Sequence, residues 1–500
     1  MKHVIGVDLG TSAVKLILMN QSGEIVNEIS KSYPLLQEKS GYSEQNPDDW
    51  VYQTIAGLSD LVAHFKGNVK DIEGVSFSGQ MHGLVLVNLS GNVLRNAILW
   101  NDTRTSEECK DIYKEVGENL LVEVTKNQAL EGFTLPKLLW VKKNEPEVYK
   151  NIKKFMLPKD YVRYKLTGEI HTEYSDAAGT LLLDVQNQRW SERICNALGI
   201  EFDICPSLVD SNEKVGTISK EVADKTGLST NTAVFAGGAD NACGAIGAGI
   251  LEEDQTMVSL GTSGVLLTYE DSGSKDFQGK VHYFNHAVPD AYYSMGVTLA
   301  AGHSLAWFKE TFAEEETFYN LLEDVKDVPI GANGLLFAPY IAGERTPHID
   351  ANIRGSFIGI DTSHQRKDFV RAIMEGVTFS LNETLEIFRK NGKNISTIIS
   401  IGGGAKNDTW LQMQADIFNA KIVKLENEQG PGLGAAILAA YGAGWYSSLK
   451  ECNRRLNFSQ NNRVYYPNEE KVRLYESLFN SYTKIYEATK NINHELMKFK

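Results

Sequence analysis

The stretch Val4-Ile5-Gly6-Val7-Asp8-Leu9-Gly10-Thr11-Ser12 decides the fold, because a similar stretch returns far along the chain. The second copy is Met257-Val258-Ser259-Leu260-Gly261-Thr262-Ser263-Gly264. In both, an apolar run ends in Leu-Gly-Thr-Ser and another apolar run follows, which predicts two β-hairpins. Glycine lets a backbone approach a phosphate closely, and the successive N–H groups of such a turn can bind an anion. The repeat therefore predicts a duplicated ATP-binding fold with the nucleotide between two halves.

Size and charge narrow the class of protein. A chain of 500 residues is too long for one ordinary core, so we expect two large domains. The net charge of −14 argues against nucleic acid or an anionic membrane as a partner. No apolar run approaches the roughly 20 residues that cross a bilayer, and we expect no signal peptide. Five scattered cysteines without a Cys-x-x-Cys pair fit a reducing compartment, so we expect a cytoplasmic protein.

Strand-like and helix-like segments alternate along both halves, which indicates the α/β class with mixed sheets. The pattern predicts three domain segments: 1–249, 250–445, and a helical tail at 446–500 packed on the second domain. The expected elements of the first half are strands at 3–8, 14–19, 24–33 and 72–78, a helix from Pro47, and a hairpin joining 84–89 to 93–99. Those of the second half are helices at 368–390, 408–419 and 432–444, strands at 395–401 and 421–425, and a charged, solvated terminal helix at 468–500.

Asp8 lies at the end of the first strand, directly before the first glycine turn. Phosphoryl transfer needs Mg²⁺ on the phosphate oxygens, and this ion keeps several waters while taking one or two carboxylates. The position of Asp8 in the sequence suits such an ion. An aspartate can equally cap the turn that follows it, so the local sequence leaves both interpretations open.

Asp240 follows Gly237-Gly238-Ala239 and opens a helix-like segment. One interpretation is a general base that takes the proton from an attacking sugar hydroxyl. The other is a helix N-cap, which the local sequence favours when Asp240 is considered alone.

Two further segments carry side chains that suit a polyol. Met81 and His82 follow a buried strand, and a neutral histidine both donates and accepts hydrogen bonds, although core packing explains such a pair equally well. Trp100 and Asn101 place an aromatic face beside an amide. The run from Gly402 to Ala405 lies between a strand and a helix, where a flat base or a phosphate can approach the backbone.

Together these segments resemble the FGGY carbohydrate kinases from about residue 3 to residue 445. Segments 132–141 and 355–375 look like the two signatures of that family. Segments 79–83, 100–102, 157–161, 175–180 and 343–348 are similar to the members that act on xylulose. One departure is Ala239, where many of those members have a third glycine and the gluconate kinases of the family also have alanine.

The resemblance implies a fold, a reaction and a set of site residues. The implied fold has two ribonuclease-H-like domains of the actin and hexokinase type, with nucleotide and sugar in a central cleft. The implied reaction is phosphorylation of D-xylulose at its 5-hydroxyl by ATP with Mg²⁺. The implied roles are Asp240 as proton acceptor, Met81, His82, Trp100, Asn101 and Asp240 at the sugar, Thr11, Ser12, Lys15, Gly261, Thr262, Gly302, Gly404 and Asp408 at ATP, and Asp8 at the metal through water.

Two alternatives stay open beside this reading. Another FGGY kinase would act on gluconate, ribulose or a further ketose, and a substrate panel separates these. An ATP-binding sensor or assembly protein would lack sugar chemistry, and the presence of Asp240 with Met81 and His82 argues against it. The oligomeric state is open, although kinases that it resembles are commonly homodimers.

Overall fold

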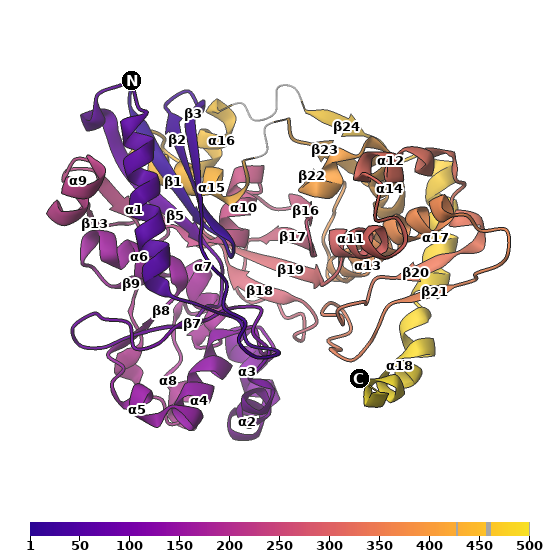
Figure 1. Cartoon of the computed structure of the whole chain (residues 1–500), viewed down its shortest axis with the longest axis horizontal. Coiled ribbons are helices and arrows are strands. Elements are labelled where there is room, and N and C mark those ends of the chain that lie inside the picture. The colour runs from indigo at the N-terminus through magenta and orange to yellow at the C-terminus, as the bar shows by residue number, and fades with distance from the viewer. Residues whose placement is uncertain (427–428, 457–461, 500) are drawn as a thin grey trace.

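The computed structural model describes residues 1–426, 429–456 and 462–499. Figure 1 shows two α/β halves side by side, each built on its own twisted sheet. The first sheet has the order β13-β14-β5-β1-β2-β3, with β15 also paired to β5. Its strands are β1 (His3–Leu9), β2 (Ala13–Asn20), β3 (Ile25–Ser32), β5 (Ile72–Gly79), β13 (Lys214–Thr217), β14 (Ala233–Phe235) and β15 (Gly238–Ala239).

The second sheet has the order β18-β19-β17-β16-β22-β23-β24. Its strands are β16 (Thr256–Leu260), β17 (Gly264–Glu270), β18 (His282–Asn285), β19 (Tyr292–Thr298), β22 (Thr397–Ile401), β23 (Lys421–Lys424) and β24 (Arg463–Tyr465). In each sheet a hairpin pairs in parallel with a later strand: β1–β2 with β5, and β16–β17 with β22. The duplication predicted from the two glycine turns is confirmed, and so are both hairpins.

Helices cover both faces of the first sheet, which explains why β1 is apolar on both sides. α1 (Pro47–Ala63) packs on β2 and β3, and it begins where Asn46 caps the helix and Pro47 occupies its first turn. α10 (Asp240–Ala248) and α15 (Gly430–Gly442) pack on one another, and α15 also packs on β1 and β5. In Figure 1, α15 and α16 (Leu449–Arg455) lie in gold among the strands of the N-terminal half.

The contact between α15 and the first sheet depends on missing side chains. A Cβ on Gly6 would lie 2.2 Å from the carbonyl oxygen of Gly432, and a Cβ on Gly434 would lie 1.9 Å from that of Cys243. The glycine-rich run at 430–436 therefore makes close contacts with β1 and with α10.

Helices of the second half include α11 (Gly302–Phe312), α13 (Arg366–Lys390) and α14 (Asp408–Phe418). The prediction of one solvated terminal helix at 468–500 is wrong. The chain forms α17 (Glu469–Tyr482) and α18 (Ile485–Leu496), and α17 packs on α13 and α14. Tyr475 is buried because its hydroxyl bonds to Arg371 and Glu375 of α13. Residues 457–461 and 500 of the predicted tail lie outside the described residues.

The hairpin predicted at 84–99 is only partly formed. Val87 bridges to Val93 and Leu84 to Ile98, but β6 (Val85–Val87) pairs along its length with β8 (Lys154–Met156) instead. The returning strand pairs instead through β7 (Ala97–Ile98) with β4 (Glu44–Gln45).

Within the described residues no helix has the length and apolar character that crossing a membrane requires.

Candidate active site

Asp8 and Asp240 form the acidic part of the site at the ends of β1 and β15. Both side chains keep partial exposure to solvent. Burial raises the pKa of the Asp8 carboxyl to about 6, against the opposing effect of Lys15. Burial, and then the negative charge of Asp8, raises the pKa of the Asp240 carboxyl to about 7. Two neighbouring acids with raised pKa values are a frequent mark of a site for proton transfer or a cation.

The geometry does not support a turn-capping role for Asp8 or a helix N-capping role for Asp240. Asp8 lies inside the β1–β2 ladder opposite Lys15, before the turn, so it caps no turn. Asp240 is the first residue of α10, and Ala239 holds the N-cap position. The Asp240 carboxylate accepts the backbone N–H of Asn241 (2.7 Å) and its side-chain amide (3.0 Å).

The backbone that leads into Asp240 needs glycine at position 237. It accommodates Ala239, the residue that departs from the family pattern. Gly237 has a φ of 85°, which favours glycine, whereas Ala239 has a φ of −57°. Ala239 donates its N–H to Ser175 (2.9 Å), and the hydroxyl of Ser175 donates to Glu173 (2.7 Å). We therefore expect no strain from alanine at this position.

Met81 and His82 lie beside Asp240. The amide of Asn241 donates to the sulfur of Met81 (3.5 Å), which links this turn to α10. His82 has a φ of 68°, and its Nδ1 donates to the carbonyl of Gly179 (2.6 Å). Burial lowers the pKa of His82 to about 3, so the imidazole is neutral and its Nε2 is the acceptor.

Trp100, Asn101 and Thr11 belong to the same part of the molecule. The indole of Trp100 donates to the hydroxyl of Thr11 (2.9 Å), and that hydroxyl donates to Gln80 (3.2 Å). The side-chain oxygen of Asn101 is buried and has no hydrogen-bond partner among the described residues. Thr11, predicted at ATP, therefore contacts Trp100, predicted at the sugar.

The other residues predicted at the first turn point elsewhere. Ser12 is exposed. The ammonium of Lys15 contacts Glu28 and Gln429, each at 3.1 Å, so it joins β2 and β3 to the segment that leads into α15.

The second turn brings together the four glycine and threonine positions predicted at ATP in the C-terminal half. Gly302, at the start of α11, donates its N–H to the carbonyl of Gly261 (2.8 Å), and Ala301 donates to that of Thr262 (3.0 Å). Gly404 lies against Leu260, where a Cβ would approach the leucine side chain to 2.6 Å. Gly261 and Thr262 themselves are exposed.

The hydrogen bonds of Asp408 connect it to a different element from this turn. It is exposed on α14, and its carboxylate accepts hydrogen bonds from Tyr465 (2.8 Å) and Arg463 (3.4 Å) of β24. The structure thus brings Asp8, Asp240, Met81, His82, Trp100 and Thr11 together, and separately brings Gly261, Thr262, Gly302 and Gly404 together.

Sequence reasoning missed several residues that support the site. Gln45 donates to the carbonyl of Thr11 (2.7 Å) and accepts from Gln80 (3.2 Å). Ser76 and Ser78 interrupt the buried run of β5, and polar residues in such a run were a signal that could have been used. Gln45 carried no comparable signal, because one glutamine before a helix is ordinary.

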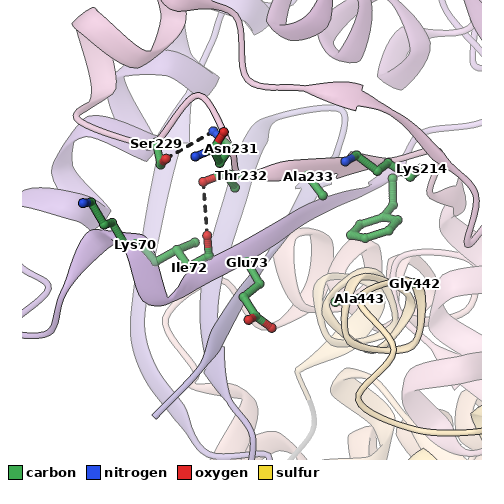
Figure 2. Close-up of a pocket in the computed structure, with 11 residues that line it drawn as sticks. Lys70, Ile72, Glu73, Lys214, Ser229, Asn231, Thr232, Ala233, Gly442 and Ala443 are labelled. Atoms are coloured by element: carbon green, nitrogen blue, oxygen red, sulfur yellow. Dashed lines mark hydrogen bonds between the residues drawn. The ribbon is translucent and has the colours of Figure 1, made fainter.

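A separate cavity of about 400 Å³ lies at the other end of α15 (Figure 2). It is lined by Gly442 and Ala443, whereas Gly432 at the start of the helix faces Asp8. Glu73 on its wall accepts the indole N–H of Trp445 (2.7 Å). None of the residues predicted for the active site lines this cavity.

Residues 3–247 match the FGGY family of carbohydrate kinases, N-terminal domain, and residues 256–443 match the C-terminal domain of the same family. The chain belongs to the FGGY family of carbohydrate kinases. Its two halves therefore have the actin and hexokinase type of fold expected from the sequence.

Several proteins are similar over the whole length. The xylulose kinase of Bacillus subtilis (strain 168) is 60% identical over 500 residues, which is all of both chains. The ligand-bound structure of xylulose kinase from Lactobacillus acidophilus is 30% identical with a TM-score of 0.93, covering 98% of this chain and 99% of that one. The gluconate kinase from the same organism is also 30% identical with a TM-score of 0.93, covering all of both chains. Similarity of fold alone therefore does not separate these two sugars.

Proposed function

We propose that the protein transfers the γ-phosphoryl group of ATP to the 5-hydroxyl of D-xylulose. The observation that carries this is the carboxyl of Asp240, with a pKa of about 7, next to the turn of Met81 and His82. The 60% identity to a xylulose kinase over the whole of both chains supports D-xylulose as the sugar.

Asp240 acts as the general base. A base is most effective when its pKa lies near the working pH, and such a group contributes roughly 10²–10⁴-fold. Asp240 accepts the proton of the 5-hydroxyl as its oxygen bonds to the γ-phosphorus, and the bond to the β-phosphate oxygen breaks to release ADP. Because the transition state is loose, orienting the hydroxyl is a large part of this contribution.

The sugar is held by neutral groups. Nε2 of His82 accepts a sugar hydroxyl, and the unpartnered oxygen of Asn101 accepts another. Met81 and Trp100 supply apolar surface against the carbon chain.

ATP binds between the two turns. The exposed backbone at Gly261 and Thr262 suits phosphates, and Gly302 and Gly404 pack closely behind it because neither has a Cβ. Thr11, Ser12 and Lys15 approach the transferred phosphate from the other half. We also propose that Asp408 lies at the outer part of the nucleotide site.

Asp8 fits a hydrated Mg²⁺. It is a single, partly exposed carboxylate, and a cation near it would relieve the repulsion between Asp8 and Asp240 that raises the pKa of Asp240. When bound, the ion would neutralise charge on the phosphates.

We further propose a cytoplasmic location, since all five cysteines are free and buried. A homodimer stays a proposal without structural support.

The test is coupled ADP release with Mg-ATP and D-xylulose, L-xylulose, D-ribulose, L-ribulose, D-gluconate or glycerol. We expect kcat/KM for D-xylulose to exceed the others by at least about tenfold, the scale on which a sugar site separates close analogues. A higher value for D-gluconate would overturn the substrate and keep the kinase.

A further inference from the structure

Lys137 is a buried lysine that the mechanism above does not use. It lies on α4 (Thr134–Asn144), and its side chain is fully buried. Its ammonium donates to the carbonyl oxygens of Gly132 (2.7 Å) and His82 (2.9 Å). Burial lowers the pKa of Lys137 well below its usual range. The negative charge of Asp102 acts on this group, but the hydrogen bonds of the ammonium go to the two carbonyl oxygens, which indicate what the buried amino group holds.

One of those acceptors belongs to a strained residue. His82 has a φ of 68°, a left-handed conformation that costs energy in any residue with a side chain and persists only where the surroundings hold it. The carbonyl of His82 accepts from Lys137 and also from the hydroxyl of Thr134 (3.1 Å), one turn earlier on the same helix. Two donors on α4 therefore hydrogen-bond to the peptide group that follows the Cα of His82.

The same conformation fixes the direction of the imidazole. Nδ1 of His82 is engaged by Gly179, and the ring packs against Phe133, the residue before α4, with 4.6 Å between ring centroids. With Nδ1 engaged, only Nε2 is left to meet a sugar. If the peptide of His82 turned, the ring would lose its bond to Gly179 and Nε2 would move.

We propose that Lys137 and Thr134 are positioning residues that set the affinity for the sugar by holding the carbonyl of His82. This inference rests on the proposed contact between His82 and the sugar. The positioning effect applies to whichever sugar is bound and does not involve the nucleotide.

The decisive variant is Thr134→Val, which removes one hydroxyl and preserves the shape of the side chain. Partial loss of the His82 position predicts a rise of roughly two- to fivefold in KM for the sugar, no larger than the effect of removing His82, with KM for ATP within about twofold. Thr134→Ser keeps the hydroxyl and is expected to restore the sugar KM. Lys137→Met is expected to act in the same direction and within the same limit.

The matched control is Lys142→Met on the same helix. Lys142 also donates to two carbonyl oxygens, those of Leu198 (2.9 Å) and Gly199 (2.5 Å), but these lie in another turn. It is expected to lower thermal stability without changing the sugar KM. If Lys137→Met does not fold, the comparison of Thr134→Val with Thr134→Ser still decides.

A background of His82→Ala separates positioning from general damage. If Thr134 acts through His82, Thr134→Val raises the sugar KM in the wild type and adds nothing in the His82→Ala protein. An equal rise in both backgrounds, or equal rises in the KM values for sugar and ATP, would overturn the proposal. The sugar used is the best acceptor in the wild-type panel, so a failure of D-xylulose counts against the proposed function alone.

Discussion

The two hairpins have the same four-residue turn and very different surroundings. In the first, Asp8 comes directly before Leu9-Gly10-Thr11-Ser12, and Thr11 bonds to Gln80 and Trp100. In the second, Ser259 takes the place of Asp8, and the turn is held through backbone groups by Ala301 and Gly302. The strand beside the first turn leads into Gln80, whereas the one beside the second leads into three glycines.

The difference indicates how a duplicated fold divides one reaction between its halves. The first turn is surrounded by the side chains for which we propose sugar binding, orientation and proton acceptance. The second presents backbone, which suits a phosphate chain. Changes near the first turn should therefore affect the sugar and the chemical step, and changes near the second should affect ATP.

The largest expected effect is that of Asp240→Asn, beside the first turn. We expect kcat to fall by roughly 10²–10⁴-fold, because the amide keeps the size of the side chain and cannot take a proton. Sugar affinity, measured by calorimetry, should stay within a few-fold. Near-normal kcat would refute the assignment of the base.

The second effect is that of Gly302→Ala, beside the second turn. A Cβ there would lie 2.6 Å from the carbonyl of Gly261, so the turn must shift. We expect KM for ATP to rise by about tenfold, the result of losing one to two hydrogen bonds to phosphate, and sugar KM to stay unchanged. Gly244→Ala on α10 is the control, since its Cβ meets nothing closer than 3.9 Å. An unchanged KM for ATP would remove Gly302 from the nucleotide site.

The third effect is that of His82→Ala, which should raise the sugar KM by roughly fivefold, with a smaller change for ATP. Alanine also disfavours the left-handed backbone at this position, so His82→Asn is the control, because asparagine tolerates it. Equal changes in the two KM values would argue against a sugar contact.

The smallest effect is the pH dependence of kcat/KM. The carboxyl of Asp240 has its pKa raised to about 7, so the active anion is present above that pH and is lost as the pH falls through it. The rate should therefore decline toward low pH with a midpoint near 7. His82 does not titrate there, since its pKa is about 3, and the His82→Asn protein should keep the decline. A flat profile from pH 6 to 8 would contradict the raised pKa.

The sequence predicted what depends on local pattern, and it failed where distant residues decide. The turns at Gly10 and Gly261 and the start of α1 at Pro47 follow from short-range chemistry. The buried Tyr475 of α17 bonds to Arg371, about 100 positions away, and the two arms of the broken hairpin pair with strands β8 and β4 from other parts of the chain. No local pattern carries such contacts.

The same limit applies to the site. Its principal residues could be named because they lie in motifs, as Asp240 and His82 do. Lys137 lies in the first family signature as well, but its role became visible only once its acceptor was known to be His82.

The most direct test of the division between the two turns is equilibrium binding without turnover. Calorimetry would measure D-xylulose and a non-hydrolysable ATP analogue with Mg²⁺, each against the His82→Asn and Gly302→Ala proteins. The division predicts that His82→Asn weakens only the sugar and Gly302→Ala weakens only the nucleotide. If either variant weakened both ligands equally, or if the pattern were reversed, the two turns would not divide the reaction as described.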